Sequence, residues 1–237
     1  MKKLSRRSFL AAAAVSAAAL ALTACGGSAS TASSAAASSV AASSEAASTS
    51  AAAAELTTVE AGKLTMATNA TFPPYEMTTD AGEFEGIDIE TAQAIADKLG
   101  LELQIDAMAY DAALLSVQQG KADSAMAGIT VTDERMAVRS FSDSYATGIQ
   151  SVIVPEGSDI ASVDDLAGKK IGTQRGTTGY LYCSDDFGED AVVAYDNGLT
   201  AVQALNNGQV DAVFIDNEPA KAYVESNPGL KILDTSY

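Results

Sequence analysis

Residues 201–216, AVQALNNGQVDAVFID, decide the fold, because they place a helix, a stop and a strand in one short run. Apolar residues recur at helical spacing as far as Gly208, a residue that typically follows the end of a helix. The apolar residues 210–215 then form a strand, and Asp216 stands at its carboxyl end. Helices that alternate with strands in this way are the units of α/β sheets.

An echo of this unit occurs earlier in the chain, at residues 113–128, ALLSVQQGKADSAMAG. The two segments align without a gap, and an internal repeat and the generic similarity of β/α units explain the match equally well. In either case Gly128 and Asp216 end comparable strands, one in each half of the chain. Open α/β sheets bind ligands at such carboxyl ends. The alignment pairs Val117 with Leu205, Gly120 with Gly208, Asp123 with Asp211, Ala125 with Val213, and Gly128 with Asp216.

Strand and helix patterns alternate along the chain from Lys63 onward. This alternation predicts two α/β lobes, residues 63–145 and 146–237, each with a mainly parallel sheet that is covered by helices. Asp111 is expected to cap the helix that runs through Val117. The expected strands are 64–68, 101–105, 122–129, 170–173 and 230–233, and the expected helices are 89–99, 111–117, a short one after Ser162 that ends at Gly168, and 217–225.

The first 24 residues have the features of an export signal peptide. A basic start precedes an Ala- and Leu-rich run at 9–22, which is shorter than the roughly 20 residues of a membrane span. The run ends in LTACG, which resembles the lipobox of bacterial lipoproteins, and a chance cysteine after a signal is the alternative. SRRSFL at 5–10 also resembles a twin-arginine signal, and the sequence does not distinguish the two export routes.

The lipobox resemblance implies cleavage before Cys25 and a diacylglyceryl group on its sulfur. Residues 25–62 are dominated by Ser and Ala up to about residue 55, and this composition predicts a flexible tether between the lipid and the folded domain. The expected location is therefore extracytoplasmic, with the protein lipid-anchored to the outer face of the cell membrane.

Composition excludes several classes of function. The chain has 14 Lys and Arg against 31 Asp and Glu, so its charge of −17 repels nucleic acid. It has no His, which excludes Ser-His-Asp catalysis and histidine-metal sites. With Cys25 assigned to lipid, Cys183 is expected to be a structural or free thiol. We expect no cofactor, no metal and a monomer.

The stretch 127–135, AGITVTDER, carries the sharpest binding signal. Thr132 is a good N-cap, which places Arg135 in the first turn of a helix. A cation there opposes the positive end of the helix dipole, and this local conflict indicates that Arg135 has another role. A plain surface arginine is the alternative that the pattern leaves open.

Four segments together resemble the solute-binding proteins of polar amino-acid ABC transporters, which have the type-II periplasmic-binding-protein fold with two α/β lobes and a hinge. The likeness runs from Lys63 to the end of the chain without a large gap. AGITVTDER is highly specific, whereas GID alone is weak. The segments are TNATFPPY at 68–75, GID at 86–88, AGITVTDER at 127–135 and VDAVFID at 210–216.

The resemblance implies that a free amino acid binds between the lobes. Arg135 would hold the ligand α-carboxylate through two parallel hydrogen bonds, helped by the backbone N–H of Thr130. Asp216, from the second lobe, would pair with the α-ammonium group. The carbonyl of Gly128 and the hydroxyl of Thr130 would accept hydrogen bonds from the same ammonium.

The resemblance also assigns the rest of the cleft. The loop GTTG at 176–179, which includes Thr178, would complete the carboxylate cradle through a backbone N–H, and we expect it to open a helix, where the helix dipole favours an anion. Phe72 and Tyr110 match the aromatic residues that sandwich the ligand side chain. Taken alone, each aromatic residue is more often part of a core.

Asn69 and Gln174 match positions that contact the far end of the ligand side chain. Relatives often have Asp at one of these positions or Lys at the other, whereas both are neutral amides here. The pair therefore favours a neutral polar ligand such as glutamine over lysine, arginine or glutamate. Glu76, Glu85 and Asp88 are acidic residues that can still reach this end.

Residues 145–149 match the first crossing between the lobes, where hinge motion is expected. A ligand that bridges Arg135 and Asp216 binds the closed form better and so shifts the population toward it. Relatives recross to the first lobe and add closing helices. This chain stops at Tyr237, so the C-terminal part of the first lobe is expected to be missing.

The leading hypothesis is a lipid-anchored receptor, without catalysis, that delivers an amino acid to the permease subunits of an ABC transporter. One alternative is an extracytoplasmic dehydratase on the same fold, with Glu or Asp as general acid. The expected ammonium-binding role of Asp216 argues against it. The other alternative is a sensor domain that feeds no transporter, and sequence does not separate it from the first hypothesis.

Overall fold

The computed structural model describes residues 56–234. The expected export signal, Cys25 and most of the expected tether lie outside these residues. Within 56–234, no helix combines the length and the apolar character that crossing a bilayer requires. Residues near the start of this part already contact the domain, since the Val59 N–H donates to Asp123 Oδ1 at 2.8 Å.

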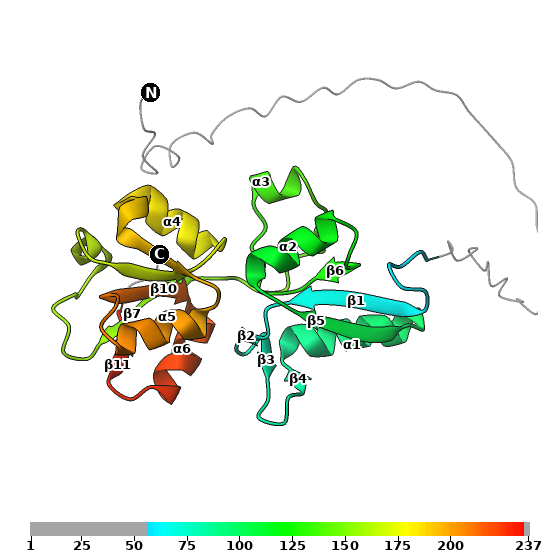
Figure 1. The fold of residues 1–237 in the computed structure, drawn as a ribbon, viewed down its shortest axis with the longest axis horizontal. Helices are drawn as coiled ribbons and strands as arrows, with labels where there is room; N and C mark the ends of the chain where they lie inside the picture. The colour runs from blue at the N-terminus through cyan, green and yellow to red at the C-terminus, as the bar shows by residue number, and fades with distance from the viewer. Residues whose placement is uncertain (1–55, 235–237) are drawn as a thin grey trace, which may run out of the picture. The chain divides into compact units, whose positions relative to one another are not determined.

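The first sheet has three parallel strands in the order β5-β1-β6. Two helices cover its opposite faces (Figure 1), because neighbouring residues of a strand point to opposite sides. Met66 packs with Ile89 of one helix, whereas Ala67 packs with Ala113 of the other. The elements are β1 (Lys63–Thr68), β5 (Glu102–Ala107), β6 (Ser124–Ala125), α1 (Ile87–Leu99) and α2 (Tyr110–Gln118).

A small antiparallel sheet, β2-β3-β4, lies between β1 and α1 in the sequence. The dipeptide Pro73-Pro74, whose peptide bond is cis, separates its first two strands. Its strands are β2 (Thr71–Phe72), β3 (Glu76–Thr78) and β4 (Phe84–Glu85). The short helix α3 (Asp133–Met136) follows β6 and begins after the N-cap Thr132, as the sequence predicts.

The second sheet has five strands in the order β11-β7-β10-β8-β9. On one face Val213 packs under α5 and α6, and on the other Phe214 packs with Cys183 of α4. The strands are β7 (Gln150–Pro155), β8 (Ile171–Gln174), β9 (Val192–Tyr195), β10 (Ala212–Asp216) and β11 (Leu230–Ile232). The helices are α4 (Thr178–Phe187), α5 (Gly198–Asn206), α6 (Asn217–Ser226) and the 3₁₀ turns η2 (Val163–Leu166) and η3 (Glu189–Ala191).

The two aligned sequence segments have the same local structure. The Asp123 carboxylate accepts the Thr65 N–H at 2.8 Å, and the Asp123 N–H donates to the Thr65 carbonyl at 2.9 Å. Asp211 exchanges the same two bonds with Lys170, at 2.7 and 2.8 Å. In both lobes an aspartate thus ties a helix–strand connection to the neighbouring strand. Gly120 and Gly208, which end the preceding helices, have φ angles of 65° and 67°.

Most predicted helices and strands are confirmed close to their expected bounds, but the strand expected at 122–129 is wrong in length. Only Ser124 and Ala125 are in register with β1, and the backbone bonds of Asp123 to Thr65 and of Met126 to Ala67 mark the two ends of this short edge strand. The N-cap predicted at Asp111 is also wrong. The N-cap of α2 is Ala109, and the Asp111 side chain instead accepts the Ala112 N–H at 2.9 Å.

The expectation of mainly parallel sheets holds fully only for the first sheet. In the second, β8, β9 and β10 are parallel, whereas β7 is antiparallel to both β10 and β11. The short helix expected between Ser162 and Gly168 is the 3₁₀ turn η2, which Ser162 and Asp165 cap with a capping box. Residues 137–149, which contain no helix or strand, separate the two larger sheets.

Asp123→Ala is expected to lower the free energy of unfolding by about 1–3 kcal/mol, because two backbone N–H groups lose their acceptor. Urea denaturation monitored by circular dichroism measures this loss. Asp80→Ala, in an exposed turn, is the matched control and should change stability by less than about 0.5 kcal/mol. Equal stabilities for the two variants would contradict the stabilising role of the hydrogen bonds that Asp123 accepts.

Candidate functional site

A narrow pocket is lined by residues from both larger sheets and from the small one. Several of its side chains stand at or just after the carboxyl ends of strands, where open α/β sheets bind ligands. Asn69 follows β1, Gln174 ends β8 and Asp216 ends β10. The lining residues are Asn69, Phe72, Glu76, Tyr110, Ala127, Gly128, Thr130, Gln174, Thr177, Thr178 and Asp216.

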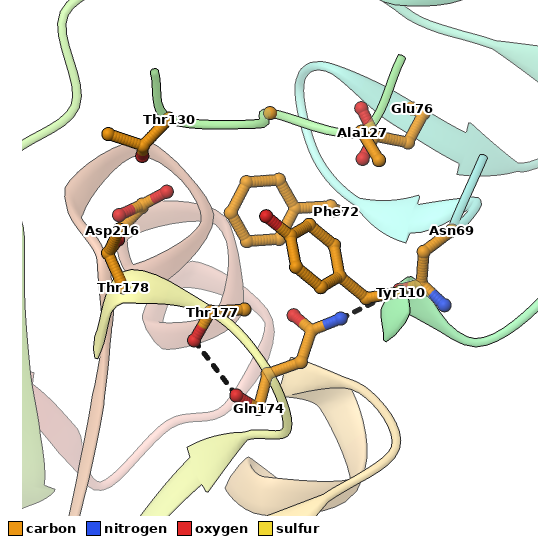
Figure 2. A pocket seen from close by; sticks show the side chains of 11 residues that line it. Asn69, Phe72, Glu76, Tyr110, Ala127, Thr130, Gln174, Thr177, Thr178 and Asp216 are labelled. Carbon is orange, nitrogen blue, oxygen red and sulfur yellow. Dashed lines mark hydrogen bonds between the residues drawn. The ribbon is translucent and has the colours of Figure 1, made fainter. Parts of the chain in front are cut away.

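All the predicted ligand-binding residues except Arg135 line this pocket. Figure 2 shows the rings of Phe72 and Tyr110 in its middle. Thr130, Thr178 and Asp216 lie at one end, and Asn69 and Glu76 lie at the other. The pocket therefore has two polar ends joined by an aromatic passage.

Backbone shape makes room for the aromatic passage. Phe72 and Tyr110 are 6% and 5% exposed, so both rings are held by their surroundings. Gly128 has a φ of 56°, and a Cβ atom there would come within 2.8 Å of the Phe72 ring. The loop after β6 can pass this close to the ring only because residue 128 is glycine.

Arg135 does not line the pocket. Its backbone N–H is capped by Thr132 Oγ1 at 3.2 Å, which fixes the first turn of α3. Its guanidinium donates to the Thr130 carbonyl at 2.8 Å and to the Gly176 carbonyl at 3.0 Å, and it lies 5.8 Å from the centroid of the Tyr110 ring. The bond to Gly176 links the α3 segment to the loop after β8.

The loop 176–179 opens α4, as the sequence predicts. Thr177 is the N-cap, and its hydroxyl accepts the Tyr180 N–H at 3.2 Å and donates to the Gln174 carbonyl at 2.8 Å. Thr178 and Gly179 are the first residues of this helix. The first turn of a helix presents N–H groups without intrahelical acceptors, so this end of the pocket favours an anionic group.

Asp216 ends β10 beside the same helix. Its Oδ1 accepts a hydrogen bond from Nε2 of Gln150, a buried residue at the start of β7 that the sequence reasoning did not single out. Burial raises the pKa of Asp216 from 3.8 to about 6, although the positive charge of Arg135 acts in the opposite direction. Near neutral pH this carboxylate is an incompletely compensated negative charge, suited to a cationic partner.

The two predicted amides contact one another. Gln174 Nε2 donates to Asn69 Oδ1 at 3.1 Å, and the Asn69 amide nitrogen donates to the Met108 carbonyl at 2.8 Å. The Tyr223 hydroxyl makes a further link from α6 to the Thr71 carbonyl. The Gln174–Asn69 and Tyr223–Thr71 bonds join segments of the first lobe to segments of the second around the pocket.

Glu76 lines the pocket but was named from sequence only as an acidic residue within reach. Its side chain is fully buried, and neither carboxyl oxygen has a hydrogen-bond partner among the described residues. Only its position just after the FPPY segment marked it, because burial within a two- or three-residue strand leaves no periodic pattern. Thr177 and Ala127 are further lining residues that were not singled out individually.

The family model for "Bacterial extracellular solute-binding proteins, family 3" matches residues 64–197. The "ABC transporter arginine-binding protein 1" of Escherichia coli K12 is 31% identical over 182 residues, which is 75% of this chain and 74% of that protein. The "Probable histidine-binding protein" of Neisseria gonorrhoeae is 32% identical over 166 residues, which is 69% of this chain. The matched part spans 62% of the gonococcal protein.

Solved structures show the same likeness. An ancestral arginine-binding protein bound to glutamine superposes with a TM-score of 0.71 at 40% sequence identity, over 75% of this chain and 80% of that one. A similarity at this level extends beyond the general fold to the sequence. The match supports the two-lobed α/β architecture expected from the sequence.

Asp216→Asn is expected to change how stability depends on pH. Because the folded pKa is raised, the folded protein holds a proton that the unfolded chain loses between pH 3.8 and about 6, so wild-type stability falls as pH rises through this window. At pH 7 the variant should be more stable by up to about 3 kcal/mol, and the difference should vanish near pH 4.

Urea denaturation at pH 4, 5, 6 and 7 measures this difference. Asp190→Asn, an exposed aspartate of the second lobe, is the control and should follow the wild type. A constant difference across the four pH values would show that burial does not perturb the Asp216 carboxyl.

Proposed function

Because the chain belongs to family 3 of the bacterial extracellular solute-binding proteins, we propose that it binds a free polar amino acid and presents it to the permease of an ABC transporter. The observation that supports this proposal most directly is the pocket with two different polar ends, since an α-amino acid has a zwitterionic head and a distinct side chain. Asp216 and the first turn of α4 suit the head, and the passage between Phe72 and Tyr110 suits the side chain.

In this proposal Asp216 pairs with the α-ammonium, and the carbonyl of Gly128 and the hydroxyl of Thr130 accept from the same group. The α-carboxylate lies at the first turn of α4, near Thr178. Arg135 exchanges its bond to the Gly176 carbonyl for the carboxylate, while its bond to Thr130 keeps the guanidinium oriented. The ligand thereby replaces one link between the lobes with stronger, charge-assisted links.

Two observations bear on the ligand side chain. The Asn69–Gln174 pair is neutral and favours a carboxamide such as that of glutamine. The buried Glu76 favours a second candidate, a cationic side chain such as that of arginine. Both ligand types occur among the relatives, as an arginine-binding protein of E. coli and an ancestral protein bound to glutamine.

The delivery step rests on the N-terminal features of the sequence. We propose that residues 1–24 are removed on export, that Cys25 carries the lipid anchor, and that the serine- and alanine-rich residues after it tether two lobes, 63–145 and 146–237, to the outer face of the membrane. A monomeric receptor on such a tether can meet the permease at a high local concentration.

Arg135→Ala and Asp216→Ala should each weaken amino-acid binding by roughly 2–5 kcal/mol, because each leaves one charge of the ligand head without its partner. Isothermal titration calorimetry measures the affinities, and circular dichroism checks that both variants fold. Arg175→Ala is the control, since this exposed arginine bonds to the Ala194 carbonyl and does not line the pocket. Wild-type affinity in both site variants would defeat the assignment.

A thermal-shift panel of the common amino acids tests the function itself. A ligand present at 100 times its Kd should stabilise the protein by about 2.7 kcal/mol if only the folded form binds it. Glutamine and arginine are expected to give the largest shifts. Turnover of prephenate-like acids, together with no shift for any amino acid, would favour an enzyme instead.

A further inference from the structure

Glu76 is an unpartnered acid in the wall of the pocket. It lies on β3 with its side chain fully buried, and both carboxyl oxygens lack hydrogen-bond donors among residues 56–234. In the same part of the chain, none of the ion pairs involves Glu76. A buried polar group without a partner costs about 1–3 kcal/mol, so its retention calls for an explanation.

Asp88, in the first turn of α1, is equally buried but fully partnered. One of its oxygens accepts the Tyr145 hydroxyl at 2.7 Å, and the other accepts the Gly128 N–H at 3.3 Å. Both partners are donors, and a carboxylate is the form that accepts from two donors at once. Asp88 therefore uses both of its oxygens as acceptors, whereas Glu76 uses neither.

Two carboxyl groups that share a dry site do not both ionise, so Glu76 holds the proton. Burial, followed by the charge of Asp88 and a hydrogen bond that the protonated Glu76 can donate to that carboxylate, raises the pKa of Glu76 to about 11. The side-chain end of the cleft thus carries one negative charge and one proton. Asp216 of β10 also raises the pKa of Glu76. Glu76 in turn raises the pKa values of the tyrosines that face it, which are Tyr75, Tyr110 of α2, Tyr145 and Tyr223 of α6.

We propose that this end of the cleft exchanges a proton for a cation: Glu76 holds the proton while the cleft is free and releases it when a cationic ligand side chain enters. The inference rests on the proposed amino-acid-binding function. It adds that glutamine and arginine are accepted by two protonation states of one residue.

The arrangement of the pocket gives the exchange its geometry. A ligand whose head lies at Asp216 extends its side chain between Phe72 and Tyr110 and ends beside Glu76 and Asn69 (Figure 2). With a carboxamide, the protonated Glu76 donates its O–H to the amide oxygen. With a guanidinium or ammonium, the O–H bond breaks, its electron pair stays on the carboxylate, and the proton passes to the buffer.

Charge accounting favours this exchange over entry of the cation alone. Before binding, the two carboxyl groups hold one proton between them and carry a net charge of about −1. After binding, two carboxylates and one cation carry the same net charge. The new ion pair is buried, where a charge is stable only with a partner and hydrogen bonds.

Calorimetry of the purified protein tests the inference directly. Arginine and glutamine are titrated at pH 7.5 in buffers that differ in ionisation enthalpy, because the dependence of the observed heat on buffer counts the protons released. We expect about one proton per arginine and none per glutamine. The ratio of arginine to glutamine affinity should also rise about tenfold per pH unit between pH 7 and 8.5. Titration of the α-ammonium group does not affect this ratio, because both ligands carry that group.

Glu76→Gln keeps the shape of the side chain and removes the exchangeable proton. It should lower the affinity for arginine by at least about 30-fold and abolish the proton release that accompanies arginine binding. The affinity for glutamine should change by less than about threefold. Glu85→Gln is the matched control, because Glu85 is exposed on the neighbouring strand β4. This control should leave both ligands and the proton count unchanged.

Three results would overturn the exchange. They are arginine binding without proton release, proton release that persists in Glu76→Gln, and binding of glutamine with no detectable binding of arginine. If none of the common amino acids gives a heat of binding, the proposed function is wrong, and the proton exchange is wrong with it. Thermal denaturation of each variant shows whether a lost signal reflects unfolding.

Discussion

The hydrogen bond from the Arg135 guanidinium to the Gly176 carbonyl is the contact on which the site depends. It joins the segment after β6 to the segment after β8, and so brings together the carboxyl ends of two different sheets. Around it lie the two elements that a zwitterionic head requires, an acid at the end of β10 and the first turn of α4. A neutral carbonyl is a weaker hydrogen-bond partner for a buried cation than a carboxylate is, so a ligand carboxylate can displace the Gly176 carbonyl from the Arg135 guanidinium.

Much of this arrangement could be read from the chain, because the relevant signals are local. The helix, glycine stop and strand in 201–216 predict α5 and β10, and Thr132 predicts the start of α3. The features that could not be predicted depend on how strands distant in the sequence pair with one another. The length of β6 depends on where β1 stops bonding to it, and the antiparallel course of β7 depends on its neighbours β10 and β11.

The pocket shows the same division between local and long-range signals. Its predicted members came from motif positions, and all but Arg135 line the pocket. The state of Glu76 could not be predicted, because it results from three distant segments: β3 carries it, Asp88 of α1 adds charge, and Tyr145 takes up a neighbouring oxygen. Sequence shows an acidic residue in such a place, but only packing shows that it has no partner.

The bond between Asn69 and Gln174 has a consequence of its own. The orientation of the Asn69 amide is fixed, because its nitrogen donates to the Met108 carbonyl and its oxygen accepts from Thr71 Oγ1 as well as from Gln174. The Gln174 nitrogen is therefore also committed, and its oxygen is left without a partner among the described residues. The seam between the lobes thus offers an acceptor of fixed polarity to the cargo.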